Sequence, residues 1–345
     1  MKIATITYSW AQNWGAVLQA YALVEYLNSM GHDAKLIDYR EFDNKLISTV
    51  KSIPDGIVDL LTISASKRRI LRYNEFREKA LKLTEKCNNT AELKKLNKDF
   101  DAFVTGSDQV WNVGFGVCKD FYLEFADSEK KRISYAPSFG VTSIPEEHRK
   151  DTIEGINNIQ ELSVREESGR KIIADLTGRE ATVVLDPVFL LTQDQWKKVS
   201  KPSGQKEKYI FVYPTQITPK LKAAVKLLKE KTGLKAVSPF YIPGCKTAKD
   251  IGPREFIDYI ANAEYVVASS FHATAFSLIF NKKLIVITHN MTGSRTTDLL
   301  TRVGMESCII SDVKEVETFR WNYDKCNKLM EKYINESKGF LDKAL

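Results

Sequence analysis

The chain has 345 residues, of which 43% are apolar and 28% are charged. This composition is typical of a globular protein and excludes collagen-like, disordered and disulfide-scaffold chains. The net charge of +7 is a mild basic bias for this length. It suits an anionic small substrate, a phosphorylated lipid carrier or a membrane surface, and it is not typical of a nucleic-acid-binding protein.

Short β-rich runs alternate with helical patterns along the first half of the chain. A strand is expected at Ile3–Thr7, a helix with one apolar face at Ala16–Met30, and a second strand at Ala34–Tyr39. Gly31 supplies the helix stop. Later strands are expected at Asp101–Thr105, Ile133–Tyr135, Leu162–Arg165 and Thr182–Leu185, and helices at Glu146–Ile156 and near residues 91–98.

A basic helix is also expected in the less regular stretch from Asp43 to Asn97, with Lys67, Arg68, Arg69, Arg72 and Arg77. A solvated face is the first interpretation of such a charge run, and contact with an acceptor or a phospholipid is the second.

The second half repeats the same alternation. Strands are expected at Tyr209–Tyr213, Lys235–Val237, Tyr265–Ala268, Leu284–Thr288 and near Cys308–Ile310. Helices are expected at Thr218–Lys231, Pro253–Asn262, Ala273–Phe280, Arg295–Val303 and, as a tail, Asn322–Leu341. Alternation of this kind predicts an α/β fold in which parallel sheets are covered by helices on both faces.

The length favours two domains over one. Asp186-Pro187 interrupts the pattern, since proline removes a backbone donor and biases its predecessor away from helix. We therefore expect an N-terminal Rossmann-like domain over residues 1–190, onto which a C-terminal helix at 320–345 packs back, and a second Rossmann-like domain over residues 191–319.

The cysteines and the apolar runs bear on the compartment. Cys87, Cys118, Cys245, Cys308 and Cys326 are odd in number and form no CxxC pair, which favours reduced thiols in the cytoplasm. The N-terminal stretch does not fit a signal peptide, and no apolar run is long enough to cross a membrane. Any membrane contact is expected to be peripheral, at the inner face.

Polar and aromatic clusters follow several expected strands, which is where open parallel sheets bind ligands. In the first half these clusters contain Trp10, Asn13, Trp14, Gly15, Ser107, Asp108, Gln109, Trp111, Ser138 and Arg165. In the second half they contain Ser269, Ser270, His272, Thr274, His289, Ser294 and Arg295. If the two domains face a central cleft, these loops line it.

His272 lies where a strand feeds a short helix among hydroxyl side chains. Backbone N–H groups at a helix start attract anions, so the cluster predicts a phosphate or carboxylate subsite in which His272 also moves a proton. A capping serine beside a partly buried histidine is the competing interpretation. His289 is expected to be structural.

Other residues in these loops have two interpretations each. Arg165 and Arg295 fit clamps on a carboxylate or phosphate, or ion pairs, with Glu166 or Glu167 as partners of Arg165. Asp108 fits a base for a sugar hydroxyl, or a cap of the next turn. Trp10, Trp14 and Trp111 fit stacking against a sugar ring, or core packing.

Several chemistries are disfavoured by missing motifs. The chain has no GxGxxG, no GxxxxGK[ST], no GxSxG and no cluster with metal-ligand spacing. Its one DxD, Asp99-Phe100-Asp101, precedes a strand instead of following it. Hydride transfer, NTP hydrolysis and metallohydrolysis therefore lose support.

Six segments, in order, resemble the polysaccharide pyruvyl transferase family. They begin with Asn13-Trp14-Gly15-Ala16-Val17-Leu18-Gln19-Ala20-Tyr21-Ala22-Leu23 and Phe103-Val104-Thr105-Gly106-Ser107-Asp108-Gln109-Val110-Trp111-Asn112. They continue with Ile133-Ser134-Tyr135-Ala136-Pro137-Ser138-Phe139-Gly140, Ser163-Val164-Arg165-Glu166, Leu185-Asp186-Pro187 and Ser269-Ser270-Phe271-His272-Ala273-Thr274-Ala275-Phe276. Together they cover about residues 1–310.

The resemblance implies two Rossmann-like domains facing a cleft, as in GT-B glycosyltransferases. It also implies transfer of a pyruvyl group from phosphoenolpyruvate to two sugar hydroxyls, which gives a cyclic ketal and phosphate. In similar enzymes a His in the SSFH-type motif is the catalytic candidate, here His272, and an Arg in the position of Arg165 contacts the donor. The acceptor is a saccharide or lipid-linked glycan in surface polysaccharide biosynthesis.

The chain departs from the family pattern in two places. Ser270-Phe271 stands where Arg-Leu is common, so one phosphate-binding charge is missing, and we hypothesise that Arg295 replaces it. Ala273 stands where Gly is frequent.

The implied chemistry needs no metal or organic cofactor, with phosphoenolpyruvate as co-substrate. His272 is the expected acid, Asp108 the expected base, and arginines and a helix N-terminus suit so anionic a donor. The alternatives are a GT-B glycosyltransferase that uses a nucleotide-sugar and a non-catalytic glycan-binding homologue.

Overall fold

The computed structural model describes residues 1–10, 12–40, 60–288, 293–317 and 321–345, with the backbone alone at 60–66, 293–294 and 317. The chain divides into two compact units. Unit 1 comprises Met1–Gly56, Arg77–Leu190 and Tyr333–Leu345, and unit 2 comprises Ile57–Phe76 and Leu191–Lys332. Of the described residues, 60–76 fall in unit 2 in this division.

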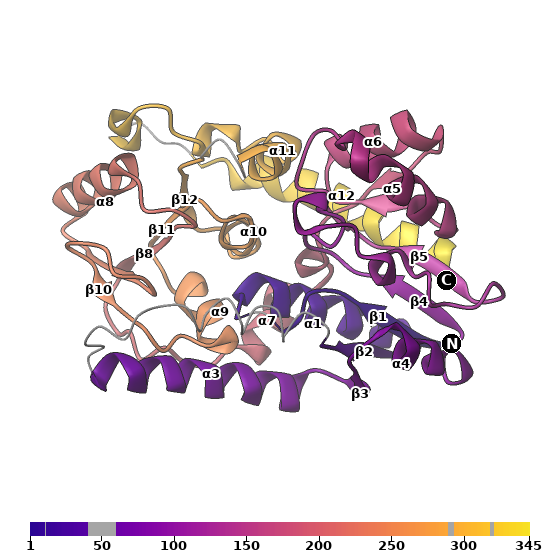
Figure 1. Ribbon diagram of the computed structural model, residues 1–345. Helices are drawn as coiled ribbons and strands as arrows, with labels where there is room; N and C mark the ends of the chain where they lie inside the picture. Colours follow the sequence, from indigo (N-terminus) through magenta and orange to yellow (C-terminus); the bar gives the residue numbers. More distant parts are fainter. Residues whose placement is uncertain (11, 41–59, 289–292, 318–320) are drawn as a thin grey trace. The chain divides into compact units, whose positions relative to one another are not determined.

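Unit 1 is built on a five-stranded parallel sheet in the order β3-β2-β1-β4-β5 (Figure 1). Its strands are β1 (Lys2–Ile6), β2 (Asp33–Tyr39), β3 (Leu83–Cys87), β4 (Ala102–Thr105) and β5 (Lys131–Ser134). A parallel pair of β6 (Ser163–Val164) and β7 (Thr182–Val183) follows. A single bridge from Ile133 to Glu161 links this pair to β5.

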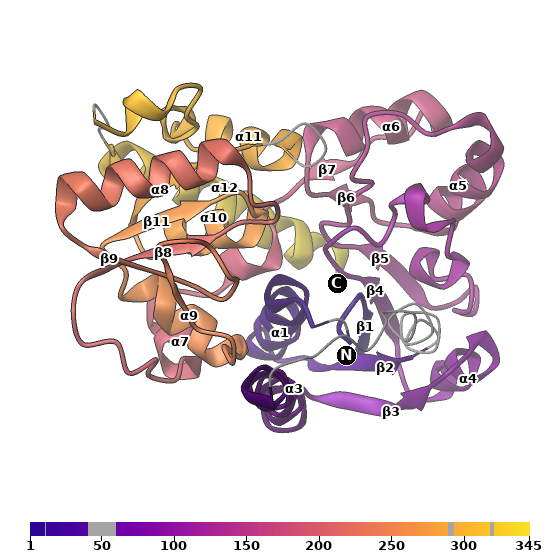
Figure 2. The same ribbon diagram turned by 60° about the vertical axis from the view of Figure 1, so that its left-hand side comes forward.

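Helices cover both faces of the unit 1 sheet. The helical elements are α1 (Trp14–Ser29), α4 (Thr90–Lys94), η1 (Lys95–Lys98), η2 (Val113–Phe115), η3 (Lys119–Tyr122), α5 (Glu146–Asn158), α6 (Glu167–Thr177) and η4 (Pro187–Leu190). Alternation along β1 explains the two layers, because Ala4 and Ile6 join the aromatic core on one face while the residues between them point to the other. In the two ribbon views α5 and α6 lie on one side of the sheet and α1 on the other (Figure 2).

Unit 2 repeats the plan with a parallel sheet in the order β10-β9-β8-β11-β12. Its strands are β8 (Tyr209–Tyr213), β9 (Lys235–Ser238), β10 (Lys246–Thr247), β11 (Tyr265–Ala268) and β12 (Lys283–Val286). Its helices are α7 (Gln193–Val199), α8 (Pro219–Thr232), α9 (Pro253–Ala261), α10 (Phe271–Ile279) and α11 (Gly293–Arg302), with the short turns η5 (Glu306–Cys308) and η6 (Val313–Glu317).

Alternate residues of β8 again separate the two layers. Ile210 and Val212 pack under α8, whereas Phe211 and Tyr213 contact Phe256 of α9. The helices α3 (Leu60–Ala80) and α12 (Tyr323–Ala344) contribute residues to both units. The predicted α/β class with parallel sheets is confirmed.

The basic helix is more than a solvated face. In unit 2, Arg72 of α3 donates to the backbone oxygen of Asp250 at 2.6 Å and lies 3.7 Å from Glu255 at the start of α9. In unit 1, Arg77 is buried and donates to the backbone oxygen of Ser9. Both arginines therefore hold elements of their own unit in place.

The prediction of a strand near Cys308–Ile310 is wrong. The chain forms the 3-10 turn η5 there, and only Ile309 bridges to Val286. The N–H groups of Cys308 and Ile309 bond back to Met305 and Glu306, which leaves one residue to pair with β12.

Candidate active site

The first cluster lies at the carboxyl edge of the unit 2 sheet, where β11 leads into α10. Ser270 caps the helix with an extended backbone, and its side chain makes no capping hydrogen bond. His272 stands in the first turn and is 8% exposed. A helix start whose N–H groups are not satisfied by the capping side chain, with an imidazole beside it, suits an anion.

Ser269 ties this helix start to the loop after β8. Its Oγ accepts a hydrogen bond from the backbone N–H of Thr215 at 2.8 Å and lies 3.0 Å from Thr215 Oγ1. Ser269 is buried and Thr215 is exposed. Sequence reasoning missed Thr215, although it follows β8, the strand that pairs with β11, and therefore lies at the same edge.

Thr274 has a structural contact. Its Oγ1 donates to the backbone oxygen of Ser270 at 3.0 Å, and the residue is fully buried. It rigidifies the first turn of α10 and presents no exposed surface to a ligand.

Arg295 belongs to the same edge of unit 2. It is the third residue of α11, which follows β12, and β12 pairs with β11. Its side chain is half-buried. Ser294 lies in the first turn of α11, described by its backbone, and His289 lies outside the described residues.

The second cluster lies at the carboxyl edge of the unit 1 sheet. Asn13 caps α1, and its Oδ1 accepts from the N–H groups of Gly15 at 2.9 Å and Ala16 at 3.3 Å. Trp14 and Gly15 are buried inside the first turn. Asn13 is the exposed member of this group.

Asp108 has an unusual backbone. Its φ of 74° is left-handed, and its Oδ1 accepts from the N–H of Gln109 at 2.9 Å. Its backbone oxygen accepts from the N–H of Ser138 at 2.8 Å, which ties the loops after β4 and β5 together. The Asp108 carboxylate is half-buried, and these two hydrogen bonds together with the strained backbone fix its orientation.

Gln109 is part of a tight contact with the next loop. Its Oε1 accepts from Asn112 Nδ2 at 2.5 Å. Gly140 lies against this pair with a φ of +68°, and a Cβ there would be 2.4 Å from Gln109 Oε1. The left-handed φ favours glycine at this position, and a larger residue would also have to displace the Gln109 and Asn112 amides.

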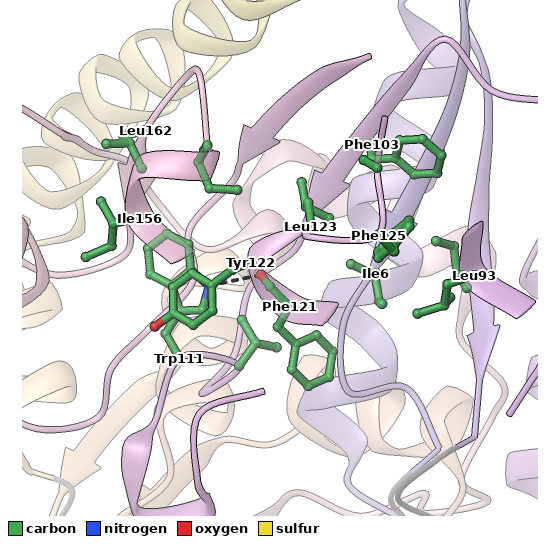
Figure 3. Close-up of a cluster of buried hydrophobic side chains, with 14 of the residues drawn as sticks. Ile6, Leu93, Phe103, Trp111, Phe121, Tyr122, Leu123, Phe125, Ile156 and Leu162 are labelled. Atoms are coloured by element: carbon green, nitrogen blue, oxygen red, sulfur yellow. Dashed lines mark hydrogen bonds between the residues drawn. The ribbon is translucent and has the colours of Figure 1, made fainter. Parts of the chain in front are cut away.

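Trp111 packs in the core. Its ring is 2% exposed and stacks on Tyr122 with centroids 5.0 Å apart, and its Nε1 donates to the backbone oxygen of Phe121 (Figure 3). This burial leaves no ring face for a sugar. Trp10 instead has a guanidinium on its ring, since Arg40 lies 3.3 Å from the ring centroid.

Arg165 is the centre of a buried polar network. Its Nη1 donates to Asp186 Oδ2 at 2.9 Å, and Ser107 Oγ donates to the same oxygen at 2.8 Å. Its Nε lies 3.6 Å from Glu166, whose other oxygen accepts from Ser138 Oγ at 2.6 Å. The expected partner Glu166 is present, and the closer partner Asp186 is one that sequence reasoning missed.

The electrostatics of Arg165 follow from this burial. Loss of water alone would lower the pKa of the guanidinium, but the charges of Asp186, Glu166 and Asp108 outweigh that cost and raise it. Arg165 therefore stays charged, with its charge compensated inside unit 1.

Searches over the described parts of the chain give three negative findings. No group of three or more histidine, cysteine or acidic side chains there could hold a metal ion. No described helix combines the length and the apolar character needed to cross a bilayer. All five cysteines are free thiols.

Comparisons with solved structures support the fold. The chain resembles AviGT4, a glycosyltransferase involved in avilamycin A biosynthesis, with a TM-score of 0.51 at 12% identity over 100% of this chain and 97% of that one. It also resembles a putative UDP-N-acetylglucosamine 2-epimerase from Listeria monocytogenes, with a TM-score of 0.50 at 8% identity over 97% and 90%. At such identities the likeness shows a GT-B-like fold.

Comparisons of sequence identify the family. No curated protein matches the chain. The profile of the family described as polysaccharide pyruvyl transferase matches residues 13–291, which include every described cluster residue from Asn13 to His272. The family name implies a transferase that acts on polysaccharide, and the chain belongs to the polysaccharide pyruvyl transferase family.

Proposed function

We propose that this protein transfers the pyruvyl group of phosphoenolpyruvate to two hydroxyls of a saccharide acceptor, forming a cyclic ketal and releasing phosphate. The family match over residues 13–291 carries the proposal, because it spans both units and includes the buried histidine at the start of α10.

The donor is assigned to unit 2. Phosphoenolpyruvate carries a phosphate and a carboxylate, so it needs positive potential and N–H donors more than an apolar pocket. The start of α10 supplies N–H groups that Ser270 does not cap, and Arg295 follows the neighbouring strand. We assign to Arg295 the phosphate-binding charge that an arginine commonly supplies in the family at the position of Ser270.

His272 is assigned the proton that the donor must receive. When a sugar hydroxyl attacks the central carbon of phosphoenolpyruvate, the methylene carbon takes a proton and becomes a methyl group. An imidazole is suited to this transfer near neutral pH. His272 lies in the first turn of α10, and the proposed phosphate subsite is the start of the same helix.

The acceptor is assigned to unit 1. Asp108 is the proposed base that takes the proton of the attacking hydroxyl, and its tethered loop fixes the carboxylate. The second hydroxyl then attacks the same carbon and gives up its proton. The C–O bond to phosphate breaks, phosphate leaves with the electron pair and takes up that proton, and the ketal closes. We assign Asn13 to acceptor binding as an exposed residue of its loop.

Arg165 acts in this scheme through the loop it holds. Its guanidinium is bound by Asp186 and sits next to Glu166, so its charge fixes the loops after β4, β5 and β6.

The experiment is phosphate release by the purified chain. Phosphoenolpyruvate is offered with a panel of 4-nitrophenyl hexopyranosides, and in parallel UDP-glucose and UDP-galactose are offered with the same panel. The proposal expects phosphate release that depends on a glycoside, together with a product heavier than the glycoside by one pyruvate less one water.

Two results would overturn it. Release of UDP without any acceptor-dependent release of phosphate would make the protein a nucleotide-sugar glycosyltransferase. Binding of a glycoside with no turnover of either donor would make it a glycan-binding protein. A lipid-linked acceptor at the inner face of the membrane extends the panel if the glycosides bind weakly.

A further inference from the structure

Gln19 and Thr7 form a buried hydrogen-bond chain that ends at the residue before Asp108. Gln19 lies on α1, and its Nε2 donates to Thr7 Oγ1 at 3.0 Å and to the backbone oxygen of Ala16 at 3.0 Å. Thr7 directly follows β1, and its Oγ1 donates to the backbone oxygen of Ser107 at 2.7 Å. Gln19 is 0% exposed and Thr7 is 4% exposed. The chain therefore runs through the interior of unit 1, from α1 to the loop after β4.

The direction of each hydrogen bond in this chain follows from its chemistry. A backbone oxygen can only accept, so the contact with Ala16 identifies the amide nitrogen of Gln19, and the same nitrogen reaches Thr7. Because Thr7 Oγ1 accepts from Gln19, its own proton is left to donate, and the acceptor is Ser107. Hydrogen bonds in such a chain polarise and strengthen one another. Gln19 therefore orients the Thr7 hydroxyl toward the backbone of Ser107.

The bond to Ser107 fixes one of the two peptide groups that flank the α-carbon of Asp108. The backbone oxygen of Ser107 belongs to the peptide group before Asp108, and it accepts from Thr7 at 2.7 Å. The backbone oxygen of Asp108 belongs to the peptide group after it, and it accepts from the N–H of Ser138 at 2.8 Å. Planar peptide groups leave φ and ψ as the only soft backbone rotations. Two fixed peptide groups therefore fix both angles, and with them the direction in which the side chain leaves the backbone.

This restraint matters because the backbone conformation of Asp108 is unfavourable. Its φ of 74° is uncommon for a residue that has a Cβ, and such a conformation persists where the surrounding structure holds it. Ser107 is also held through its side chain, since its Oγ donates to Asp186 Oδ2 at 2.8 Å. Loss of the bond from Thr7 would leave the peptide group before Asp108 with fewer restraints and free the carboxylate to turn.

We propose that Gln19 and Thr7 are positioning residues for Asp108: the hydrogen-bond chain from α1 holds the peptide group before Asp108 and thereby sets the direction of its carboxylate. The inference rests on the proposed function, in which this carboxylate takes a proton from the acceptor hydroxyl. The restraint is measurable without turnover. The N–H of Gln109 donates to Asp108 Oδ1 at 2.9 Å, so its exchange with solvent reports whether the carboxylate keeps its place.

The test is amide hydrogen exchange of Gln109, followed by NMR in the full chain labelled with 15N. Thr7→Val replaces the hydroxyl with a methyl group, and the N–H of Gln109 is expected to exchange roughly fivefold faster, which corresponds to the loss of one hydrogen bond. Thr7→Ser keeps a hydroxyl at this position and the wild-type rate. Gln19→Met removes the amide donor from a side chain of similar length and changes the rate in the same direction as Thr7→Val.

Two controls make the result specific. Thr5→Val makes the same substitution in β1, where the hydroxyl of the buried Thr5 lies 3.5 Å from the backbone oxygen of Lys35, and it leaves the Gln109 rate unchanged. The N–H of Leu36, which donates to the backbone oxygen of Lys82 at 2.8 Å, is the reference amide for a loss of stability of all of unit 1. A rise of the Gln109 and Leu36 rates by the same factor, or an equal rise in Thr5→Val, overturns the inference.

The outcomes separate this inference from the proposed function. An unchanged Gln109 rate in Thr7→Val overturns the inference even if the enzyme releases phosphate, and an unchanged rate in Gln19→Met overturns the assignment of Gln19. The expected rates in a protein that never releases phosphate support the restraint on Asp108 and overturn the proposed function.

In a protein that turns over, the positioning role has a kinetic signature. Thr7→Val lowers kcat by roughly fivefold to tenfold and leaves the KM for phosphoenolpyruvate unchanged, because the donor is assigned to unit 2. Thr7→Ser restores kcat. An unchanged kcat in a Thr7→Val protein with a raised Gln109 rate would overturn the positioning role.

Discussion

The guanidinium of Arg165 lies 2.9 Å from the carboxylate of Asp186, and the two side chains are 2% and 0% exposed. These residues are far apart in sequence, and the parallel pairing of β6 with β7 brings them together, since Val164 lies opposite Val183. A buried charge pair of this kind fixes the geometry of its surroundings, because separation of either partner leaves an uncompensated charge away from water.

The first prediction concerns this pair. Asp186→Asn leaves the buried guanidinium without its closest counter-charge and lowers the free energy of unfolding by about 3–5 kcal/mol. Urea denaturation followed by circular dichroism measures the loss. Asp175→Asn, on the exposed side of α6, is the matched control and changes the free energy by no more than about 0.5 kcal/mol. Equal stabilities of the two variants would show that the pair contributes nothing.

Substitution of His272 distinguishes donor binding from catalytic turnover. His272→Gln removes the proposed acid and lowers turnover by about 10²–10⁴-fold, while phosphoenolpyruvate still raises the melting temperature because the helix start remains. Differential scanning fluorimetry and phosphate release measure the two effects. His148→Gln, on α5 in unit 1, serves as the control and keeps full activity. Unimpaired turnover in His272→Gln would remove the acid from the scheme.

Ser269 tests the link between the loop after β8 and the start of α10. Ser269→Ala frees the N–H and hydroxyl of Thr215 from their bonds to Oγ, and the loop loses its attachment. One hydrogen bond of about 1 kcal/mol corresponds to a roughly fivefold weaker affinity for phosphoenolpyruvate. Isothermal titration calorimetry measures it, with Ser200→Ala at the end of α7 as the control. An unchanged Kd would place the donor elsewhere.

Trp111 distinguishes core packing from sugar stacking. Trp111→Ala removes a buried ring that stacks on Tyr122 and lowers the free energy of unfolding by about 3–5 kcal/mol. Trp111→Phe retains most of the packing and leaves the KM of the acceptor unchanged. Phe115→Ala, whose ring is 68% exposed, is the stability control. A raised acceptor KM in a stable Trp111→Phe protein would restore the stacking role.

The buried cysteines predict a pH-dependent reactivity. Burial raises the pKa of Cys87 to about 11 and those of Cys308 and Cys326 to about 12. At pH 8 the native thiols are therefore almost entirely protonated, and iodoacetamide modifies them far more slowly than it does in urea. Peptide mass spectrometry after timed alkylation measures each site. Native rates equal to those in urea would contradict the burial.

The alternation of strands and helices was predictable because buried parallel strands are continuous apolar runs. For this reason the sequence predicts β8 and β11 as strands. β3 did not, because an edge strand with the sequence Leu83–Cys87 is half-exposed and carries charges. α7 was also missed, although Thr192 and Gln195 form a capping box that signals its start.

The sequence predicts where the candidate residues lie along the fold better than it predicts which contacts their side chains make. The rule that ligands bind beyond parallel strands selected Asp108 and His272 as candidates, and in the structure they lie in the segments that follow β4 and β11. It could not show that the Trp111 ring packs in the core or that Arg165 pairs with Asp186, because both depend on contacts between distant segments. Thr215 was missed because a single threonine after a strand carries no pattern of its own.

The most direct measurement is the reaction of the purified chain with phosphoenolpyruvate and an accepted glycoside in D2O, with the product examined by NMR. The account predicts a ketal whose methyl group carries one solvent deuterium, because the methylene carbon of the donor takes its third hydrogen from an acid on the protein. A glycoside that gains no pyruvyl ketal, or a ketal whose methyl carries no solvent deuterium, would contradict it.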